Sequence, residues 1–371
     1  MTVGIKTIIV AGARPNFMKV APLMKRIAEQ DRNSDRGWFD VRLVHTGQHY
    51  DQKMSDVFFQ ELGIPAPDIN LGVGSGSQAV QTASVMTSFE PVCVSEKPDW
   101  VIVVGDVNST VACTLVCAKM GIRVAHVEAG LRSFDRAMPE EINRIVTDSL
   151  ADLLLTPSED GNQNLRREGV AEERIKLVGN IMIDSLIENL PMSRQSNILN
   201  RLGLKSGQFA FVTLHRPSNV DGKESLTAIM AEVERLASWV PVVFPIHPRT
   251  RKMLGEFGIM PSEGKGLQLI DPIGYHDSLC LTENARLLLT DSGGLQEEAT
   301  YFRTPCLTLR PSTERPVTVT MGSNRLTNLD RLAADIEEFL GGPERRGVIP
   351  PLWDGGTARR TLDEIIGASW R

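Results

Sequence analysis

Residues 100–127 read WVIVVGDVNSTVACTLVCAKMGIRVAHV, an apolar run, a helix-length segment and a second apolar run. We expect strands at Trp100–Val104 and Val124–Val127, with a helix at Val111–Met120 between them. Strands this apolar are typical of a parallel sheet that helices cover on both faces. Neighbouring parallel strands also need a crossover connection, which a helix of this length supplies. The stretch therefore predicts an α/β protein.

The same alternation extends through both halves of the chain and predicts two Rossmann-like domains. The other expected strands are Thr7–Val10, Val41–Val44, Leu153–Thr156, Phe209–Leu214, Val242–Ile246, Leu267–Ile270, Leu287–Thr290 and Cys306–Leu309. A polar, weakly patterned stretch, 191–207, is interpreted as the linker. We expect an N-terminal domain at 1–190 and a C-terminal domain at 208–350. They would face each other across a cleft, with ligands at the carboxyl ends of the strands.

Composition narrows the class of protein. The chain has 371 residues, 42% hydrophobic and 23% charged, which is ordinary for a soluble globular protein of two domains. Its net charge is −6 and its pI about 5.7, and Lys and Arg form no run. This pattern argues against a nucleic-acid or anionic-membrane partner.

Cysteine usage and hydropathy indicate the compartment. The five cysteines lie mostly in apolar segments without the paired spacing of zinc or redox sites, which fits a reducing cytoplasm. No apolar run is long enough to span a bilayer, and the first strand is expected almost at once, without a signal-peptide pattern. We therefore expect a cytoplasmic protein without a membrane partner.

The first candidate site follows the first expected strand. Gly12 permits a tight turn there, and Pro15 suits the first turn of a helix. Arg14 and Lys19 flank that helix start, where two cations would favour an anion such as phosphate. The alternative is that both are solvated surface charges.

Two acidic residues follow adjacent expected strands. Asp106 could cap the next helix, but Asn108, Ser109 and Thr110 are competent caps nearer to it, which frees Asp106 for function. Glu128 directly follows a buried strand, where an acidic residue packs poorly. A desolvated carboxylate at a strand end suits acid/base chemistry.

The expected helix from Pro139 to about Ala151 adds a third carboxylate. Glu140 and Arg144 lie four residues apart, with Asn143 between them, so the three share a face. The alternative to a functional role is a surface ion pair between Glu140 and Arg144. Because Glu128 lies only a short loop earlier, we expect three carboxylates to converge on one substrate.

The second half supplies an anion site of a different kind. His215 follows an expected strand and could protonate a leaving phosphate, although a satisfied core histidine is the alternative. The run Asp291-Ser292-Gly293-Gly294 opens a helix and offers a hydroxyl and backbone N–H groups to a diphosphate. Glu298 could bind ribose hydroxyls, and Arg315 adds a cation. The other histidines lack metal-ligand spacing, so no metal is expected.

From about Thr7 to about Leu326 the chain resembles the non-hydrolysing UDP-N-acetylglucosamine 2-epimerases. The resemblance rests on motifs that occur in the same order: Arg14-Pro15 with Lys19, Thr46-Gly47-Gln48-His49, Gly105-Asp106, His126–Arg132, Pro139-Glu140-Glu141 with Asn143-Arg144, Thr213–Arg216, Asp291–Gly294 with Gln296–Glu298, and Glu314-Arg315-Pro316. Each motif alone is weak, but the ordered set is specific.

The resemblance implies a glycosyltransferase-B-like architecture and a homodimer. It implies that the C-terminal region 351–371, with a helix at about Thr357–Ile366, packs back on the N-terminal domain. It also implies interconversion of UDP-GlcNAc and UDP-ManNAc without a cofactor. In that reaction the proton leaves sugar C2 as UDP departs from C1, which gives a 2-acetamidoglucal to which UDP adds back.

By the same resemblance, Asp106, Glu128 and Glu140 match the family's acid/base carboxylates, and His215 matches the residue that assists the departing diphosphate. The positions that match its UDP contacts are Arg14, Lys19, Arg144, Ser292, Gly293, Gly294, Glu298 and Arg315. A glycosyltransferase of the same architecture, a sugar-nucleotide sensor, a hydrolysing epimerase and an epimerase for a modified UDP-sugar are the alternatives.

The family's allosteric UDP-GlcNAc pocket is matched only in part. Gln48, Gln78 and Arg216 remain, but Asp51 and Ser77 stand where the pocket uses a polar residue and an arginine. We therefore hypothesise that activation by a second UDP-GlcNAc is weak or absent. A hyperbolic reaction from UDP-ManNAc alone would support this hypothesis, and a demand for added UDP-GlcNAc would contradict it.

Overall fold

A computed structural model describes residues 4–33, 38–47, 64–261, 264, 266–342 and 347–370, and these form two units. Unit 1 comprises Met1–Ser185 with Pro351–Arg371, and unit 2 comprises Leu186–Pro350. The chain passes into unit 2 inside helix α7 (Ile181–Ser193), so the expected linker 191–207 belongs to unit 2. Ile198 and Leu204 in that stretch are buried in the unit 2 core. The mostly polar composition of the stretch gave no indication of this burial.

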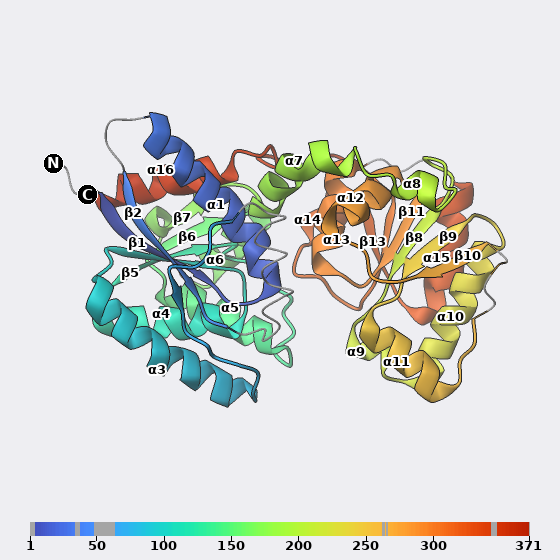
Figure 1. Ribbon diagram of the computed structural model, residues 1–371, viewed down its shortest axis with the longest axis horizontal. Helices are drawn as coiled ribbons and strands as arrows, with labels where there is room; N and C mark the ends of the chain where they lie inside the picture. The colour runs from blue at the N-terminus through green and yellow to red at the C-terminus, as the bar shows by residue number, and fades with distance from the viewer. Residues whose placement is uncertain are drawn as a thin grey trace. The chain divides into compact units, whose positions relative to one another are not determined.

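Unit 1 is built on a parallel sheet of seven strands in the order β3-β2-β1-β4-β5-β6-β7 (Figure 1). The strands are β1 (Ile5–Ala11), β2 (Phe39–His45), β3 (Ile69–Asn70), β4 (Trp100–Val104), β5 (Arg123–Val127), β6 (Leu153–Thr156) and β7 (Ile175–Leu177). Alternate residues of the central strands enter different cores, so the sheet is buried on both faces.

Helices cover both faces of this sheet. The helices of unit 1 besides α7 are α1 (Arg14–Asn33), α3 (Gln78–Glu96), α4 (Asn108–Met120), α5 (Pro139–Leu150), α6 (Glu159–Arg167), the short 3-10 helix η1 (Glu172–Arg174) and α16 (Thr357–Ser369). Residues of α1, α7 and α16 pack in one core, and residues of α3, α4 and α6 pack in the other. Such coverage is why β4 contains only apolar residues.

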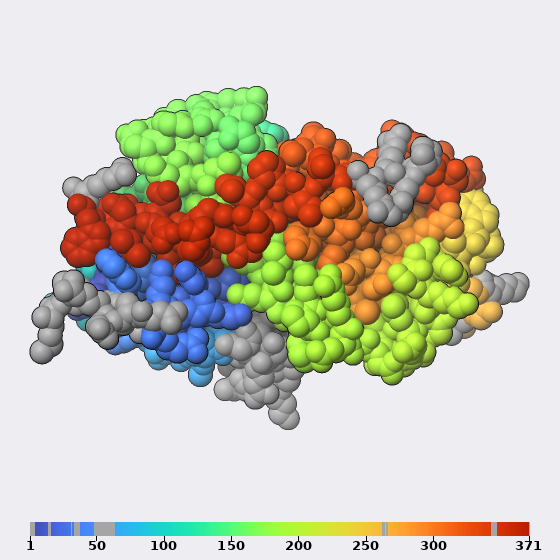
Figure 2. All heavy atoms as spheres, turned by 90° about the horizontal axis from the view of Figure 1, so that it is seen from above, coloured from blue at the N-terminus to red at the C-terminus, as the bar shows by residue number. Residues whose placement is uncertain are grey.

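The C-terminal helix α16 lies beside α1 (Figure 2). Leu362 and Ile365 enter the same core as the inward residues of α1. Asp184 of α7 accepts hydrogen bonds from the backbone N–H groups of Thr357 (3.1 Å) and Ala358 (2.7 Å). This carboxylate therefore satisfies the orphan donors at the start of α16 from a distant part of the chain.

Unit 2 repeats the architecture with six parallel strands in the order β10-β9-β8-β11-β12-β13. Its strands are β8 (Ala210–Thr213), β9 (Val242–Pro245), β10 (Leu267–Ile270), β11 (Leu287–Thr290), β12 (Cys306–Leu309) and β13 (Asn324–Thr327). Its helices are α8 (Ile198–Arg201), α9 (Pro217–Val220), α10 (Lys223–Ala237), α11 (Pro248–Phe257), α12 (Tyr275–Asn284), α13 (Gly293–Phe302), α14 (Val317–Thr320) and α15 (Leu329–Gly341). This strand order is that of the Rossmann fold.

The predicted α/β class with two Rossmann-like sheets is confirmed. Each expected apolar run coincides with a strand, although Phe209–Leu214 extends one residue beyond each end of β8 and Val242–Ile246 one residue beyond the end of β9. The strands β3, β7 and β13 were not predicted, because they are short or contain polar residues, as in Asn324-Arg325-Leu326-Thr327. Among the described residues, no helix is long and apolar enough to cross a membrane.

The hydrogen bonds from α16 to Asp184 predict that this residue stabilises the docking of α16 in unit 1. Asp184→Ala should lower the free energy of unfolding by about 3 kcal/mol, because two buried backbone N–H groups lose a charged acceptor. Hydrogen exchange should quicken in α16 before it quickens in β4. Asp363→Ala, which removes an exposed pair with Arg359, should change stability by less than about 0.5 kcal/mol. Equal losses in both variants would contradict this role for Asp184.

Candidate active site

The loops after β4 and β5 bring Asp106 and Glu128 to the same edge of the unit 1 sheet. The N–H of Gly105 donates to the carbonyl of Val127 at 3.0 Å and ties the two loops together. Gly105 has φ +68°, and a Cβ there would lie 2.7 Å from Lys19 Nζ. Only glycine therefore suits this position, for both backbone and space.

Glu128 is a buried carboxylate in a strained backbone conformation. Its φ is +73°, in the left-handed region that residues other than glycine rarely adopt. Its Oε2 forms an ion pair with Lys19 of α1, and the two residues are 4% and 6% exposed. Its Oε1 is buried without a hydrogen-bond partner among the described residues. The pair balances the buried charge and leaves one oxygen available for chemistry.

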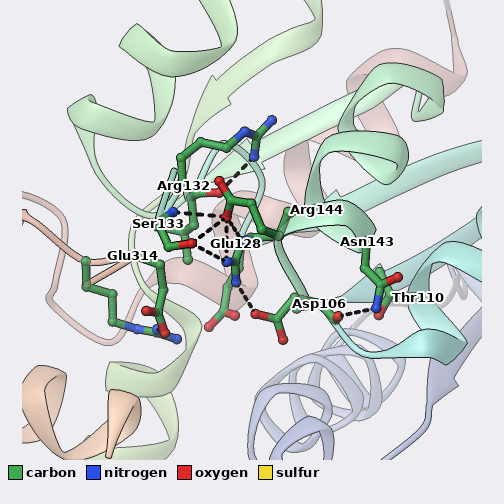
Figure 3. A network of polar contacts seen from close by, with 12 residues as sticks. Asp106, Thr110, Glu128, Arg132, Ser133, Asn143, Arg144 and Glu314 are labelled. Atoms are coloured by element: carbon green, nitrogen blue, oxygen red, sulfur yellow. Dashed lines mark hydrogen bonds and ion pairs between the residues drawn. The ribbon is translucent and has the colours of Figure 1, made fainter. Parts of the chain in front are cut away.

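Asp106 is held by Arg144, which α5 carries (Figure 3). The guanidinium donates to Asp106 Oδ2 at 2.5 Å and to Glu141 Oε2 at 2.6 Å, and Arg144 is almost fully buried. Glu141 also accepts the backbone N–H groups of Ser133 and Phe134. Burial alone would raise the pKa of Glu141, but these N–H groups and Arg144 hold it below its usual value.

The expected caps of α4 are inside the helix instead of before it. The N-cap is Val107, which has no side-chain acceptor, because the helix already begins at Asn108. Asn108 donates to Gln81, and Thr110 Oγ1 donates to the carbonyl of Val104. The carboxylate of Asp106 therefore does not cap α4.

The convergence of Asp106, Glu128 and Glu140 on one substrate stays a prediction, but the alternative of a Glu140–Arg144 surface ion pair is absent among the described residues. Arg144 pairs with Asp106 and Glu141, whereas Glu140 is partly exposed and forms no ion pair with any described residue. The helix turn directs Glu141, not Glu140, towards the sheet. Asn143 shares the network by donating to the carbonyl of Asp106 at 2.9 Å (Figure 3).

Asp291 organises the candidate site of unit 2. This fully buried carboxylate accepts the backbone N–H groups of His215 and Arg216 and the side-chain amide of Asn219. It also lies 2.9 Å from His215 Nδ1. Burial would raise the pKa of Asp291, but His215 and these N–H groups lower it. The contact directs Nε2 of the partly exposed His215 imidazole away from Asp291.

The N-terminus of α13 presents backbone N–H groups beside a cation. The helix begins at Gly293, and the Ser292 hydroxyl makes no capping bond to it. A Cβ at Gly293 would lie 3.1 Å from Arg315 Nη1, so the guanidinium lies close to the helix start. Gly294 follows in the first turn, where backbone N–H groups have no intrahelical acceptor. Such an arrangement binds anions.

Carboxylates surround that cation. Arg315 pairs with Glu297 at 2.8 Å and with Glu314 at 2.5 Å. Burial would raise the pKa of Glu314, but Arg315 and Arg310 hold it far below its usual range. Glu298, one residue beyond Glu297, is buried, and that burial together with the charge of Glu297 raises its pKa to about 8. Glu298 is therefore largely protonated at neutral pH.

Comparison with known proteins identifies the family of this chain. The UDP-N-acetylglucosamine 2-epimerase family model matches residues 31–366. The chain belongs to the UDP-N-acetylglucosamine 2-epimerase family. It is 40% identical to the UDP-N-acetylglucosamine 2-epimerase of Methanocaldococcus jannaschii over 367 residues, which cover 96% of this chain and 98% of that protein.

A second relative of this epimerase has another name. The UDP-2,3-diacetamido-2,3-dideoxy-D-glucuronate 2-epimerase of Pseudomonas aeruginosa is also 40% identical, over 97% of this chain and 99% of that protein. The crystal structure of the Methanocaldococcus jannaschii UDP-GlcNAc 2-epimerase in complex with UDP-GlcNAc and UDP superposes with a TM-score of 0.85 at 40% identity. That comparison covers 97% of this chain and 99% of the other. The glycosyltransferase-B-like fold is thus confirmed.

Some predicted positions of this epimerase fall outside the described residues. Gln48 lies there, as does the side chain of Arg14. Gln78 begins α3 and accepts a hydrogen bond from Asn108, and Arg216 donates through Nε to the carbonyl of Asp291. Lys19 pairs with the Glu128 carboxylate, and its expected contact with a bound anion stays a prediction.

The sequence analysis missed several buried charges of the epimerase. Arg132 pairs with Asp148 and Glu168. Glu141, Arg144 and Asp148 recur at the i, i+3, i+7 spacing of a buried helix face, while Ile142 on α5 is exposed. Charged residues at the spacing of a buried face, with an apolar residue outside it, could have indicated these buried charges from the sequence. The role of Asp291 gave no such signal, because its partners His215, Arg216 and Asn219 lie more than 70 residues earlier in the chain.

The raised pKa of Glu298 predicts how the stability of unit 2 depends on pH. Between the pKa of an unfolded glutamate and about 8, the folded chain keeps a proton that the unfolded chain has released. Stability should therefore fall as pH rises from about 5 to 8, by up to about 1.4 kcal/mol per pH unit. Urea unfolding of Glu298→Gln should lack this component, whereas the exposed Glu224→Gln should keep it. The same slope in wild type and Glu298→Gln would contradict a protonated Glu298.

Proposed function

We propose that this chain catalyses the reversible C2 epimerisation of UDP-N-acetylglucosamine to UDP-N-acetylmannosamine. UDP would leave and add back through 2-acetamidoglucal, without a cofactor. The observation that carries the proposal is the pair of positioned carboxylates, Asp106 and Glu128, directly after β4 and β5 in a chain of this family. Membership of the family supplies the reaction class, and these residues supply the proton transfers.

Unit 1 is assigned the chemistry at C2. Inversion needs a proton to be taken from one face of the sugar and returned to the other, so two acid/base groups are required. Glu128 is held as a carboxylate beside Lys19, and Asp106 is aligned by Arg144. Glu140, the third expected carboxylate, is proposed as an additional acid/base group from the start of α5. Fixed geometry of this kind lowers the cost of orienting the reacting groups.

Unit 2 is assigned the binding and departure of UDP. The α13 N-terminus, formed by Ser292, Gly293 and Gly294, and the Arg315 guanidinium suit the diphosphate. The His215 imidazole, oriented by Asp291, suits stabilisation of the departing charge. The carboxyl group of Glu298, protonated at neutral pH, can both donate to and accept from ribose hydroxyls.

A modified UDP-sugar is the second candidate substrate. The Pseudomonas aeruginosa relative, named for a diacetamido uronate, is as similar in sequence as the relative named for UDP-N-acetylglucosamine. The two substrates share the 2-acetamido group and the UDP leaving group, so the same C2 chemistry applies. A glycosyltransferase of this fold would require a sugar acceptor and would have no use for the carboxylates after β4 and β5.

A homodimer in the cytoplasm is proposed as the working form. The surface of α3 supports self-association, because Val80 and Val94 are 60% and 59% exposed on a helix whose charged residues are Glu90 and Glu96. All five cysteines are buried and free, which is compatible with a reducing compartment.

The proposed reaction predicts isotope exchange at a single carbon. Incubation of the protein with UDP-GlcNAc in D2O should give UDP-ManNAc with deuterium at C2 and traces of UDP and 2-acetamidoglucal. NMR of the sugar C1 and C2 protons measures these products. Glu128→Gln and Asp106→Asn should each lower turnover by about 10²–10⁴-fold, because each loses a proton-transfer group, while UDP binding changes little. The exposed Glu173→Gln should behave as wild type.

Other products would redirect the assignment. Free ManNAc would indicate a hydrolysing epimerase. Exchange with the diacetamido uronate but not with UDP-GlcNAc would select the second candidate substrate. Near-normal turnover in both carboxylate variants would remove Asp106 and Glu128 from the chemistry.

A further inference from the structure

The ring of His126 is buried in unit 1 between two hydrogen-bond acceptors. His126 is the penultimate residue of β5 and is 0% exposed. Its Nδ1 lies 2.6 Å from Asp148 Oδ1, and its Nε2 lies 2.8 Å from the carbonyl oxygen of Gly105. A carbonyl oxygen can only accept, so Nε2 must carry a proton. The charge on the ring therefore depends on what Asp148 presents to Nδ1.

Asp148 presents a carboxylate. Its Oδ2 accepts the N–H of Gly130 at 3.0 Å and Nη1 of Arg132 at 2.7 Å. Burial alone would raise the pKa of Asp148, but its contacts with His126 and Arg132 keep it below its usual value. The ion pair with Arg132 favours the ionised carboxylate whatever the charge on His126. With an ionised carboxylate at one ring nitrogen and a carbonyl at the other, both nitrogens donate. The ring is then an imidazolium, and Glu168, which pairs with Arg132, balances the charge of the set.

The groups that this ring and its carboxylate hold are the neighbours of the two proposed acid/base residues. Gly105 directly precedes Asp106, and Gly130 follows Glu128 by two residues. Gly105 and Gly130 have φ +68° and +79°, and Glu128 between His126 and Gly130 has φ +73°. Backbone in this region keeps its shape only when surrounding contacts impose it.

We propose that His126, with a proton on each ring nitrogen, is a positioning residue that, together with Asp148, fixes the loops carrying Asp106 and Glu128 for proton transfer at C2. The residue does not reach the substrate and acts through the backbone of the two loops. The proposal rests on the proposed function for its catalytic consequence. Its charge state is independent of that function.

The charge state is tested on the full-length wild-type chain. After labelling with ¹⁵N-histidine, NMR should show both ring nitrogens of His126 protonated and slow to exchange near neutral pH. A pyridine-type nitrogen on this ring would overturn the proposal, because it would mean a neutral imidazole facing a protonated Asp148. This measurement needs no variant and no turnover.

The positioning role is tested by His126→Asn, whose amide can still donate towards Asp148 but cannot reach Gly105. We expect kcat to fall about 100-fold, the effect of a misplacement of roughly 1 Å, while KM stays within about threefold. The matched control is Trp100→Phe, which removes the buried bond from Trp100 Nε1 to Ser369 Oγ at the other end of the neighbouring strand β4. It should lower the melting temperature and leave kcat unchanged.

The outcomes separate the two proposals. If wild type does not turn over any UDP-sugar, the proposed function fails while the NMR result still decides the charge of His126. If wild type is active and His126→Asn keeps the kcat of Trp100→Phe, the positioning role is refuted. If His126→Asn does not fold, the wild-type NMR spectrum alone decides, and a neutral ring would refute the proposal.

Discussion

The charged face of α5 is the constraint on which unit 1 depends. Glu141, Arg144 and Asp148 occupy positions where a helix normally places apolar residues against a sheet, and all three are buried. Losing one partner of such a pair costs about 3–5 kcal/mol, against about 0–1 kcal/mol for an exposed pair. Their partners are the loops after β4 and β5. The helix, the sheet and both loops therefore have one mutually compatible arrangement.

In unit 2 a buried carboxylate also holds loops in place, and two of its hydrogen-bond donors are backbone N–H groups. Asp291 at the end of β11 takes the N–H groups that follow β8, so one carboxylate joins two adjacent strand ends. Two buried cations of this unit, Arg310 and Arg315, form a separate group with Glu314 and Glu297. Both units thus use buried carboxylates to shape loops. In both units the donors include side chains and peptide groups.

The sequence was sufficient for the fold and only partly for the site. Apolar strands such as Trp100–Val104 are visible because burial on both faces removes polar residues from them. The position of Asp106 and Glu128 after strands followed from the same pattern. The sequence did not reveal which residue each charged side chain would pair with. The spacing of Glu140 and Arg144 allowed an ion pair, but the rotation of α5 gives Arg144 to Asp106 and Glu141 instead. Pairings between residues far apart in the chain, such as Lys19 with Glu128, depend on the folded sheet.

The docking of α16 on α1 makes unit 1 discontinuous in the chain, with the whole of unit 2 inserted between its parts. A ribosome completes unit 2 before it delivers α16. During synthesis, the apolar surface of α1 that α16 covers is therefore open to water and to other chains, and the N–H acceptor Asp184 has no helix to hold. Unit 2 can finish folding first, and the part of unit 1 that carries Asp106 and Glu128 is closed by a segment made after unit 2.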